Sequence, residues 1–131
     1  MEVKIIPVVC AIIEQDGLVL CALRSELMSL PEKWEFPGGK HEENELPEEA
    51  LIREIKEELN IEIKIIEALP IAEHAYVPEK IIQLIPFRCV IVSEQKPSAT
   101  EHEELRWVKR NELLQLDWAA ADVPIVISLL N

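Results

Sequence analysis

Acidic side chains crowd one short stretch of this chain. Eight of its 25 Asp and Glu residues lie between residues 40 and 60. A helix is predicted over 46–59, and a turn of about 100° per residue points Glu54, Glu57 and Glu58 in nearly one direction. Such neighbours repel each other by roughly 0.2–0.5 kcal/mol per pair. The face is therefore either a solvated surface or a site for hard divalent cations, which bind several carboxylate oxygens.

The residues on either side of this helix favour the cation site. Gly38 and Gly39 precede it, and glycine lets the backbone approach a ligand closely. The order then runs Gly39, five residues, Glu45, seven residues, Arg53-Glu54-Ile55, one residue, Glu57-Glu58, one residue, Asn60-Ile61. This order resembles the signature of the Nudix family, G-x5-E-x7-R-E-U-x-E-E-x-G-U, in which U is an aliphatic residue. It departs at Asn60, where the family has Gly. Asn is the next most tolerant residue of a left-handed conformation, so we expect the turn to survive.

The resemblance implies a fold and a chemistry. The fold is of the α+β class, an α/β/α sandwich around a mixed sheet, here as one domain over 1–131. Members cleave nucleoside diphosphates linked to a further group and use Mg²⁺ or Mn²⁺. A divalent cation neutralises the phosphate oxygens and lowers the pKa of a bound water, and a carboxylate then accepts the proton of that water.

The resemblance also assigns metal ligands. Glu57 and Glu58 are expected to bind the cation, with Glu54 as a further ligand or as the general base. The carbonyl of Gly39, or of its neighbour Gly38, is expected to complete the ligand shell. An acid outside the signature often joins in this family, and here we expect Glu101.

The remaining signature residues are expected to support this site. Arg53 is expected to orient the carboxylates by ion pairing, and Glu45 lies beside it at the metal edge. Lys40 and Arg24 are expected to contact the phosphates through charge-assisted hydrogen bonds. For Arg24, an ordinary surface charge is an equally good interpretation.

Two further segments indicate the substrate. The segments "WEFPGGK" and "LDWAAADVP" resemble the MutT group, which hydrolyses nucleoside triphosphates, including damaged ones, to nucleoside monophosphate and pyrophosphate. The position that selects the base in this group is Asp122, which is also a plausible N-cap of the last helix. Trp118 and Phe36 are candidates to stack on the base, although Trp118 could equally belong to the core.

Two other functions stay open from the sequence. Tyr76 and Pro78 lie near positions that mark hydrolases of dinucleoside polyphosphates and of ADP-ribose. A nucleotide-binding Nudix module without catalysis is the other alternative. Such modules usually lose the acidic residues of the signature, whereas this chain keeps Glu54, Glu57 and Glu58.

Composition limits the partners. The chain has 131 residues, 49% of them hydrophobic, and a net charge of −12, which disfavours binding to a nucleic acid polymer. Its apolar runs are too short to cross a membrane. The three cysteines form no CxxC pair, and Glu2 and Lys4 do not suit a signal peptide, so a cytoplasmic protein is expected. The sequence does not indicate an oligomeric state.

The elements that position these residues follow from periodicity and turn signals. Strands are predicted over 3–13, 18–23, 61–69, 80–92 and 104–108, and 34–40 is predicted as a strand that enters a tight loop. Besides the helix over 46–59, a helical turn is predicted over 110–116 and a last helix over 123–130.

Overall fold

Strand β1 (Lys4–Gln15) is the central strand of the structure, a computed structural model that describes residues 2–130. It pairs in parallel with β7 (Lys80–Ile91), from Lys4 opposite Lys80 to Ile13 opposite Cys89. Both strands are rich in β-branched residues, which suit a sheet that is covered on both faces. Two predicted strands are therefore confirmed, and β1 extends two residues beyond its predicted end.

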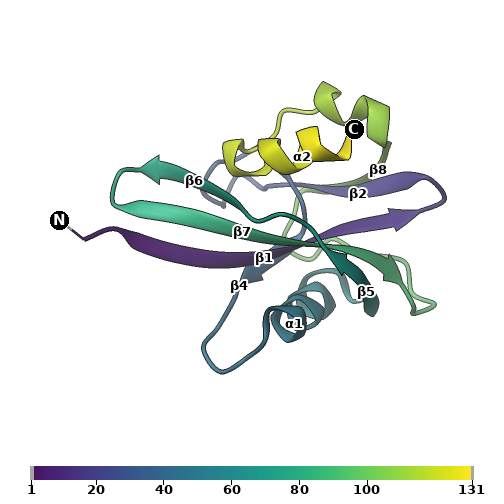
Figure 1. The fold of residues 1–131 in the computed structure, drawn as a ribbon. Helices are drawn as coiled ribbons and strands as arrows, with labels where there is room; N and C mark the ends of the chain where they lie inside the picture. The colour runs from purple at the N-terminus through teal and green to yellow at the C-terminus, as the bar shows by residue number, and fades with distance from the viewer. Residues whose placement is uncertain (1, 131) are drawn as a thin grey trace.

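The other strands extend the sheet on both sides of this pair (Figure 1). The sheet runs in the order β3-β2-β1-β7-β5, with β4 on β1, β6 on β7 and β8 on β2. Their bounds are β2 (Leu18–Leu23), β3 (Trp34–Glu35), β4 (Gly38–Lys40), β5 (Ile63–Ala68), β6 (Ala72–Val77) and β8 (Glu104–Lys109). The sequence analysis did not predict β6, because its side chains are mostly exposed and give no clear alternation.

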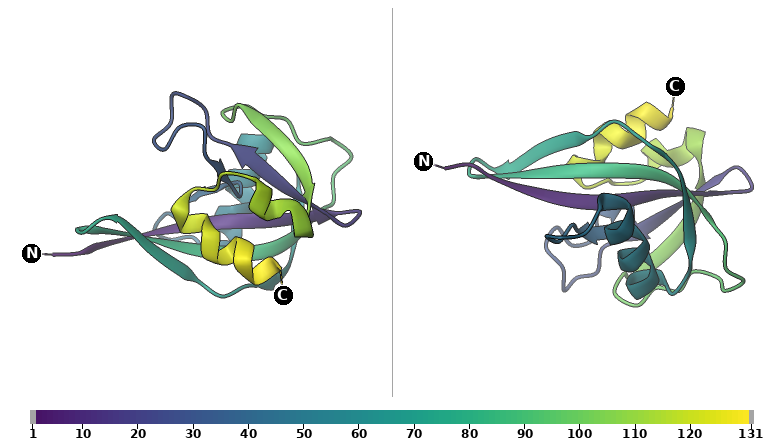
Figure 2. Two further views of the ribbon diagram at one scale, coloured as in Figure 1. Left: turned by 90° about the horizontal axis from the view of Figure 1, so that it is seen from above. Right: turned by 60° about the horizontal axis from the view of Figure 1, so that its bottom comes forward.

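The helices cover opposite faces of the sheet (Figures 1 and 2). Helix α1 (Pro47–Leu59) lies on one face, and α2 (Val123–Leu129) lies on the other with two short 3₁₀ helices, η1 (Arg110–Gln115) and η2 (Ala120–Asp122). This is the predicted α/β/α sandwich of the α+β class around a mixed sheet. Within residues 2–130, no helix is long and apolar enough to cross a membrane.

Alternation along β1 builds two hydrophobic cores. Val9, Ala11 and Ile13 point toward α1, and Cys10 and Ile12 point toward α2, because successive side chains of a strand face opposite sides. The core under α1 also contains Leu51, Ile55, Leu59 and Ile61. Burial of the apolar side of α1 therefore fixes which side faces solvent.

The ends of α1 follow from local chemistry. Leu46 precedes the helix and cannot cap it with its side chain, but its N–H donates to Glu49 Oε1 at 2.8 Å. Asn60 ends the helix at φ 56° and ψ 40°, and its N–H donates to the carbonyl of Lys56. The left-handed turn expected at Asn60 is therefore present.

Removal of the buried side chain of Ile55 tests the packing of α1. The Ile55→Ala variant should lower the free energy of unfolding by about 2–5 kcal/mol, because it leaves a cavity in the core. Ile52 lies on the same helix but is 38% exposed, so Ile52→Ala should cost less than about 1 kcal/mol. Urea unfolding of both variants measures this difference, and equal losses would contradict the placement of the core.

Candidate active site

Arg53 organises the acidic face of α1. Its guanidinium lies 2.7 Å from Glu45 Oε1, 3.0 Å from Glu54 Oε1 and 3.5 Å from Glu57 Oε2. The hydrogen bond from Arg53 lowers the pKa of Glu45 below its ordinary value. The predicted ion pairing is thus present, and it also explains how the like charges on this face are tolerated.

The two glycines of β4 allow α1 to lie directly against the strand. A side chain on Gly38 would collide with the carbonyl of Val9 on β1, and one on Gly39 would collide with the carboxylate of Glu54. At Gly38 the obstacle is backbone and only glycine fits, whereas at Gly39 the flexible Glu54 side chain would have to move. The backbone of Gly39 consequently lies beside the Glu54 carboxylate.

Glu58 is the most perturbed carboxylate of this face. Burial, together with the charges of Glu54, Glu35 and Glu101, raises its pKa to about 8. Within residues 2–130, its buried Oε2 finds no hydrogen-bond partner. A buried carboxylate oxygen without a partner is costly, and a bound cation would remove this cost.

The expected metal ligands lie near one another but do not form a complete metal-binding cluster. In the described part of the chain, no three acidic, histidine or cysteine side chains are close enough together to hold a metal ion as they stand. Arg53 draws Glu54 and Glu57 toward itself, whereas Glu58 and Glu101 line a cavity with Gly39. The donors fit a divalent cation in kind, and binding would require Glu54 and Glu57 to turn from Arg53.

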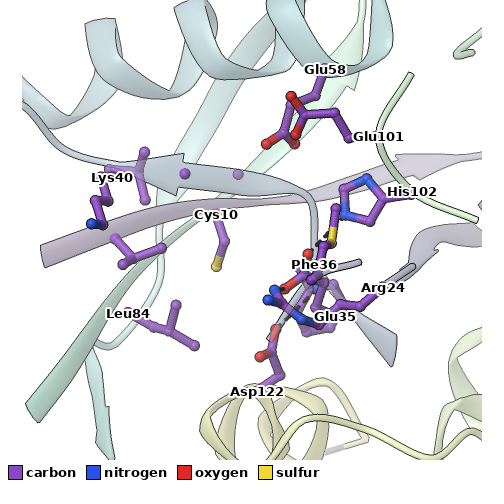
Figure 3. A pocket seen from close by; sticks show the side chains of 15 residues that line it. Cys10, Arg24, Glu35, Phe36, Lys40, Glu58, Leu84, Glu101, His102 and Asp122 are labelled. Atoms are coloured by element: carbon purple, nitrogen blue, oxygen red, sulfur yellow. Dashed lines mark hydrogen bonds and ion pairs between the residues drawn. The ribbon is translucent and has the colours of Figure 1, made fainter. Parts of the chain in front are cut away.

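A cavity of about 290 Å³ lies between the acidic face and the start of α2 (Figure 3). Glu58, Glu101, Gly39 and Lys40 form part of its wall, and Asp122 lies at its far end. A second cavity of about 360 Å³ continues from it. The two cavities share the wall residues Val8, Arg24, Glu35, Leu84 and Asp122. Together they form an elongated site with acidic groups at one end and Asp122 toward the other.

Arg24 lies on the wall of both cavities, and each of its three nitrogens makes a hydrogen bond within the protein. Its Nη1 lies 2.6 Å from Glu35 Oε1, and its Nε and Nη2 donate to the carbonyl and the hydroxyl of Ser29. It is therefore not an ordinary surface charge, and two of its five N–H donors remain for the expected phosphate contact. Its contacts join the loop after β2 to β3.

Asp122 is a buried acid with a long-range partner. Its Oδ2 accepts the backbone N–H of Phe36 at 3.0 Å. Burial is the main cause that raises its pKa to about 7, with the charge of Glu35 acting in the same direction and the Phe36 N–H opposing it. Asp122 does occupy the predicted N-cap position of α2, but its backbone is already helical and its carboxylate makes no cap hydrogen bond.

The two candidate stacking residues lie one behind the other. Phe36 lines the first cavity, and its ring centroid lies 4.7 Å from that of Trp118. Trp118 belongs to the core under α2, and its Nε1 donates to the carbonyl of Leu113. Of the two interpretations left open for Trp118, the structure favours the core, because this ring packs against Phe36 and lines neither of these two cavities.

Three residues of the cavity walls, Glu35, His102 and Tyr76, were not predicted from the sequence as part of this site. Glu35 belongs to the quoted segment "WEFPGGK", and His102 follows Glu101 directly, but neither lies at a signature position. Tyr76 was considered only as a marker of other substrates. In the structure its hydroxyl accepts the N–H of Ala121, next to Asp122, at 2.8 Å.

Known proteins resemble this chain over most of its length. The NUDIX domain family matches residues 4–129. The chain is 40% identical over 124 residues to the CTP pyrophosphohydrolase of Escherichia coli K12, which covers 94% of this chain and 90% of that protein. It is 34% identical over 134 residues to the 8-oxo-dGTP diphosphatase of Haemophilus influenzae, with 100% and 96% covered.

A solved structure agrees with these sequence matches. The MutT protein of methicillin-resistant Staphylococcus aureus 252, described as a family Nudix hydrolase, is 45% identical to this chain. Its structure superposes with a TM-score of 0.79 and covers 99% of this chain and 98% of that one. The likeness therefore extends over the whole sandwich, beyond the acidic helix alone.

The buried charge of Asp122 predicts a pH-dependent stability. Its folded-state pKa of about 7 lies above that of a free aspartate, so its contribution to folding is most favourable at low pH and weakens as the pH rises toward 7. Between pH 5 and pH 8, the wild type should lose about 2–3 kcal/mol of unfolding free energy relative to Asp122→Asn. Urea unfolding of both proteins at both pH values measures this, and a pH-independent difference would contradict it.

Proposed function

The chain belongs to the NUDIX domain family of hydrolases, and we propose that its substrates are nucleoside triphosphates, cleaved to the monophosphate and pyrophosphate. One observation carries the proposal. An acidic face that contains an unpartnered buried oxygen, Oε2 of Glu58, opens into a cavity that continues to a buried polar group, Asp122. A divalent cation held by the acidic face would bind the phosphate chain, and the buried polar group would contact the base.

Nudix hydrolases generally use divalent metals, and we propose Mg²⁺ or Mn²⁺ here. The ligands in the proposal are Gly39, Glu54, Glu57, Glu58 and Glu101. When bound, the cation neutralises phosphate oxygens and acidifies the attacking water. The chain's own groups then complete the chemistry.

Glu54 is the general base in the proposal. Burial raises its pKa and Arg53 opposes this effect, and a carboxylate whose pKa is raised is a stronger proton acceptor in its ionised form. Arg53 also holds Glu45 and so connects the loop before α1 to the base. Lys40 is exposed on the wall of the first cavity, where its ammonium group can bind the phosphate chain.

The nucleoside end is assigned to the opposite part of the site. Phe36 offers an aromatic face on the cavity wall, and Asp122 can accept a hydrogen bond from an exocyclic amine or donate one when it is protonated. The relatives are named for CTP and for 8-oxo-dGTP, which are both triphosphates with different bases. The proposal therefore names the triphosphate and includes damaged nucleotides, without choosing the base.

The same proposal includes three further expectations from the sequence. The chain forms a single domain over 1–131, the protein is located in the cytoplasm, and its partner is a small nucleotide. The three cysteines are free and buried within the described residues, which suits a reducing compartment.

Pyrophosphate release from a panel of nucleotides tests the proposed function. The panel holds the ordinary ribo- and deoxyribonucleoside triphosphates, 8-oxo-dGTP, 5-methyl-dCTP, ADP-ribose and diadenosine polyphosphates, each with and without Mg²⁺. We expect metal-dependent release of pyrophosphate from one or a few triphosphates. Monophosphate formed solely from ADP-ribose or the dinucleotides would contradict the proposal, and so would no reaction at all.

Neutralising one ligand tests the role of the acidic face. The Glu57→Gln variant should lower kcat on the order of 100-fold or more, the size of losing one electrostatic stabiliser. Its thermal stability should be kept because this side chain is 60% exposed. Glu48→Gln, on the exposed first turn of the same helix, is the matched control and should retain wild-type turnover. Wild-type turnover of Glu57→Gln would overturn the assignment.

Shortening Asp122 tests base recognition separately from the phosphate chemistry. The Asp122→Ala variant should change the ratio of kcat/KM between preferred and other bases by about tenfold or more, because a buried polar contact is lost. The same panel of triphosphates measures the ratio. Equal losses for every base would show that Asp122 does not select among them.

A further inference from the structure

His102 lies outside the acidic signature, and its imidazole is almost wholly buried in the wall of the first cavity. Its side chain is 1% exposed, and Nε2 lies 2.8 Å from Glu35 Oε2. The other ring nitrogen, Nδ1, is buried and without a hydrogen-bond partner in the part of the chain from 2 to 130. None of the roles assigned above uses this residue.

The partner of His102 lies where the two cavities meet. Glu35 belongs to the wall of both cavities, and its other oxygen, Oε1, lies 2.6 Å from Arg24 Nη1. One contact thus comes from the loop after β2 and the other from the loop before β8. Figure 3 shows His102 and Arg24 near Glu35, on the way from Glu58 and Glu101 to Asp122. The two contacts together fix the direction of this carboxylate.

The unpartnered nitrogen indicates that the imidazole is not there for packing. A buried polar atom without a partner costs about 1–3 kcal/mol, and an apolar side chain of the same shape avoids this cost. Glu35 would still keep its ion pair with Arg24 if the imidazole were replaced. The benefit of His102 must therefore lie in the geometry that it gives to the site.

We propose that His102 is a positioning residue, which donates from Nε2 to Glu35 and so holds that carboxylate in the orientation that binds a nucleotide across both cavities. The inference rests on the proposed function for its ligand. Without this donor, Glu35 can rotate about its contact with Arg24. Loss of this donor then weakens nucleotide binding more than it slows hydrolysis, because the acidic face of α1 carries out the hydrolytic step.

Two substitutions of His102 separate the hydrogen bond from the space that the ring fills. The probes are CTP and 8-oxo-dGTP with Mg²⁺. His102→Leu, which cannot donate, should raise KM about tenfold or more, the size of losing a hydrogen bond to a charged group, and change kcat by less than about threefold. His102→Gln, whose amide N–H can reach Glu35, should restore most of KM. Thermal unfolding should show His102→Leu to be as stable as the wild type or more so.

A second series tests whether His102 acts through Glu35. In a Glu35→Gln background, His102→Leu should raise KM no further, because two residues that act through one contact are not additive. A multiplied loss would overturn the proposal, and so would a wild-type KM for His102→Leu or equal impairment of the Leu and Gln variants. If His102→Leu does not fold, His102→Asn, whose shorter side chain cannot reach Glu35, replaces it in both series.

The contact itself has a readout that needs no substrate. Long-range ¹H–¹⁵N spectra of the three histidines should show the His102 ring protonated at Nε2, with a resonance that moves in Glu35→Gln. A ring protonated at Nδ1 alone would overturn the proposal. A wild type that hydrolyses neither probe nor any other triphosphate refutes the proposed function, whereas an active wild type with an unaffected His102→Leu variant refutes this inference alone.

Discussion

Repulsion among carboxylates on one face of α1 is the constraint on which the rest of the structure depends. Glu54, Glu57 and Glu58 lie within a turn of one another, and burial makes the charge of Glu58 still more costly. Arg53 offsets part of this repulsion through contacts with Glu45, Glu54 and Glu57. Glu58 has no such contact among the described residues. With its pKa raised to about 8, Glu58 is largely protonated near neutral pH, and a divalent cation is the group that would favour its ionised form.

These carboxylates can act on a ligand because the backbone places them beside a cavity. Gly38 and Gly39 leave no room for side chains, so β4 brings α1 and β1 into direct contact. On the other face, Phe36 is held by Asp122, and Trp118 supports the Phe36 ring. The segment 34–40 therefore connects the acidic end of the site to its buried far end.

Local patterns predicted the parts of the fold that local interactions decide. The strong β-branched runs indicated β1 and β7, the helical spacing of apolar residues indicated α1, and Asn60 kept the left-handed turn. Strand β6 escaped prediction because its pairing with β7, and not its own side-chain pattern, makes it a strand.

Long-range contacts explain what the sequence could not supply at the site. The carboxylate of Asp122 accepts the N–H of Phe36 and does not cap α2. Because Phe36 lies 86 residues away in the chain, the residues around Asp122 could not predict this contact. His102 and Glu35 meet across 67 residues, so no spacing rule brings them together. Trp118 could have faced either the core or the cavity, and the packing of α2 and η2 decided it.

The stability of the protein as a function of Mg²⁺ concentration tests the central claim most directly. The claim is that the acidic face is poised for a divalent cation, so a cation that binds the folded state should stabilise it. At 100 times its dissociation constant, Mg²⁺ should add about 2.7 kcal/mol to the free energy of unfolding. The measurement is urea unfolding at constant ionic strength, with Na⁺ making up the difference. A rise that saturates with Mg²⁺ in the wild type and is greatly reduced in Glu58→Gln is the predicted result. An unfolding free energy that does not respond to Mg²⁺ would contradict the account.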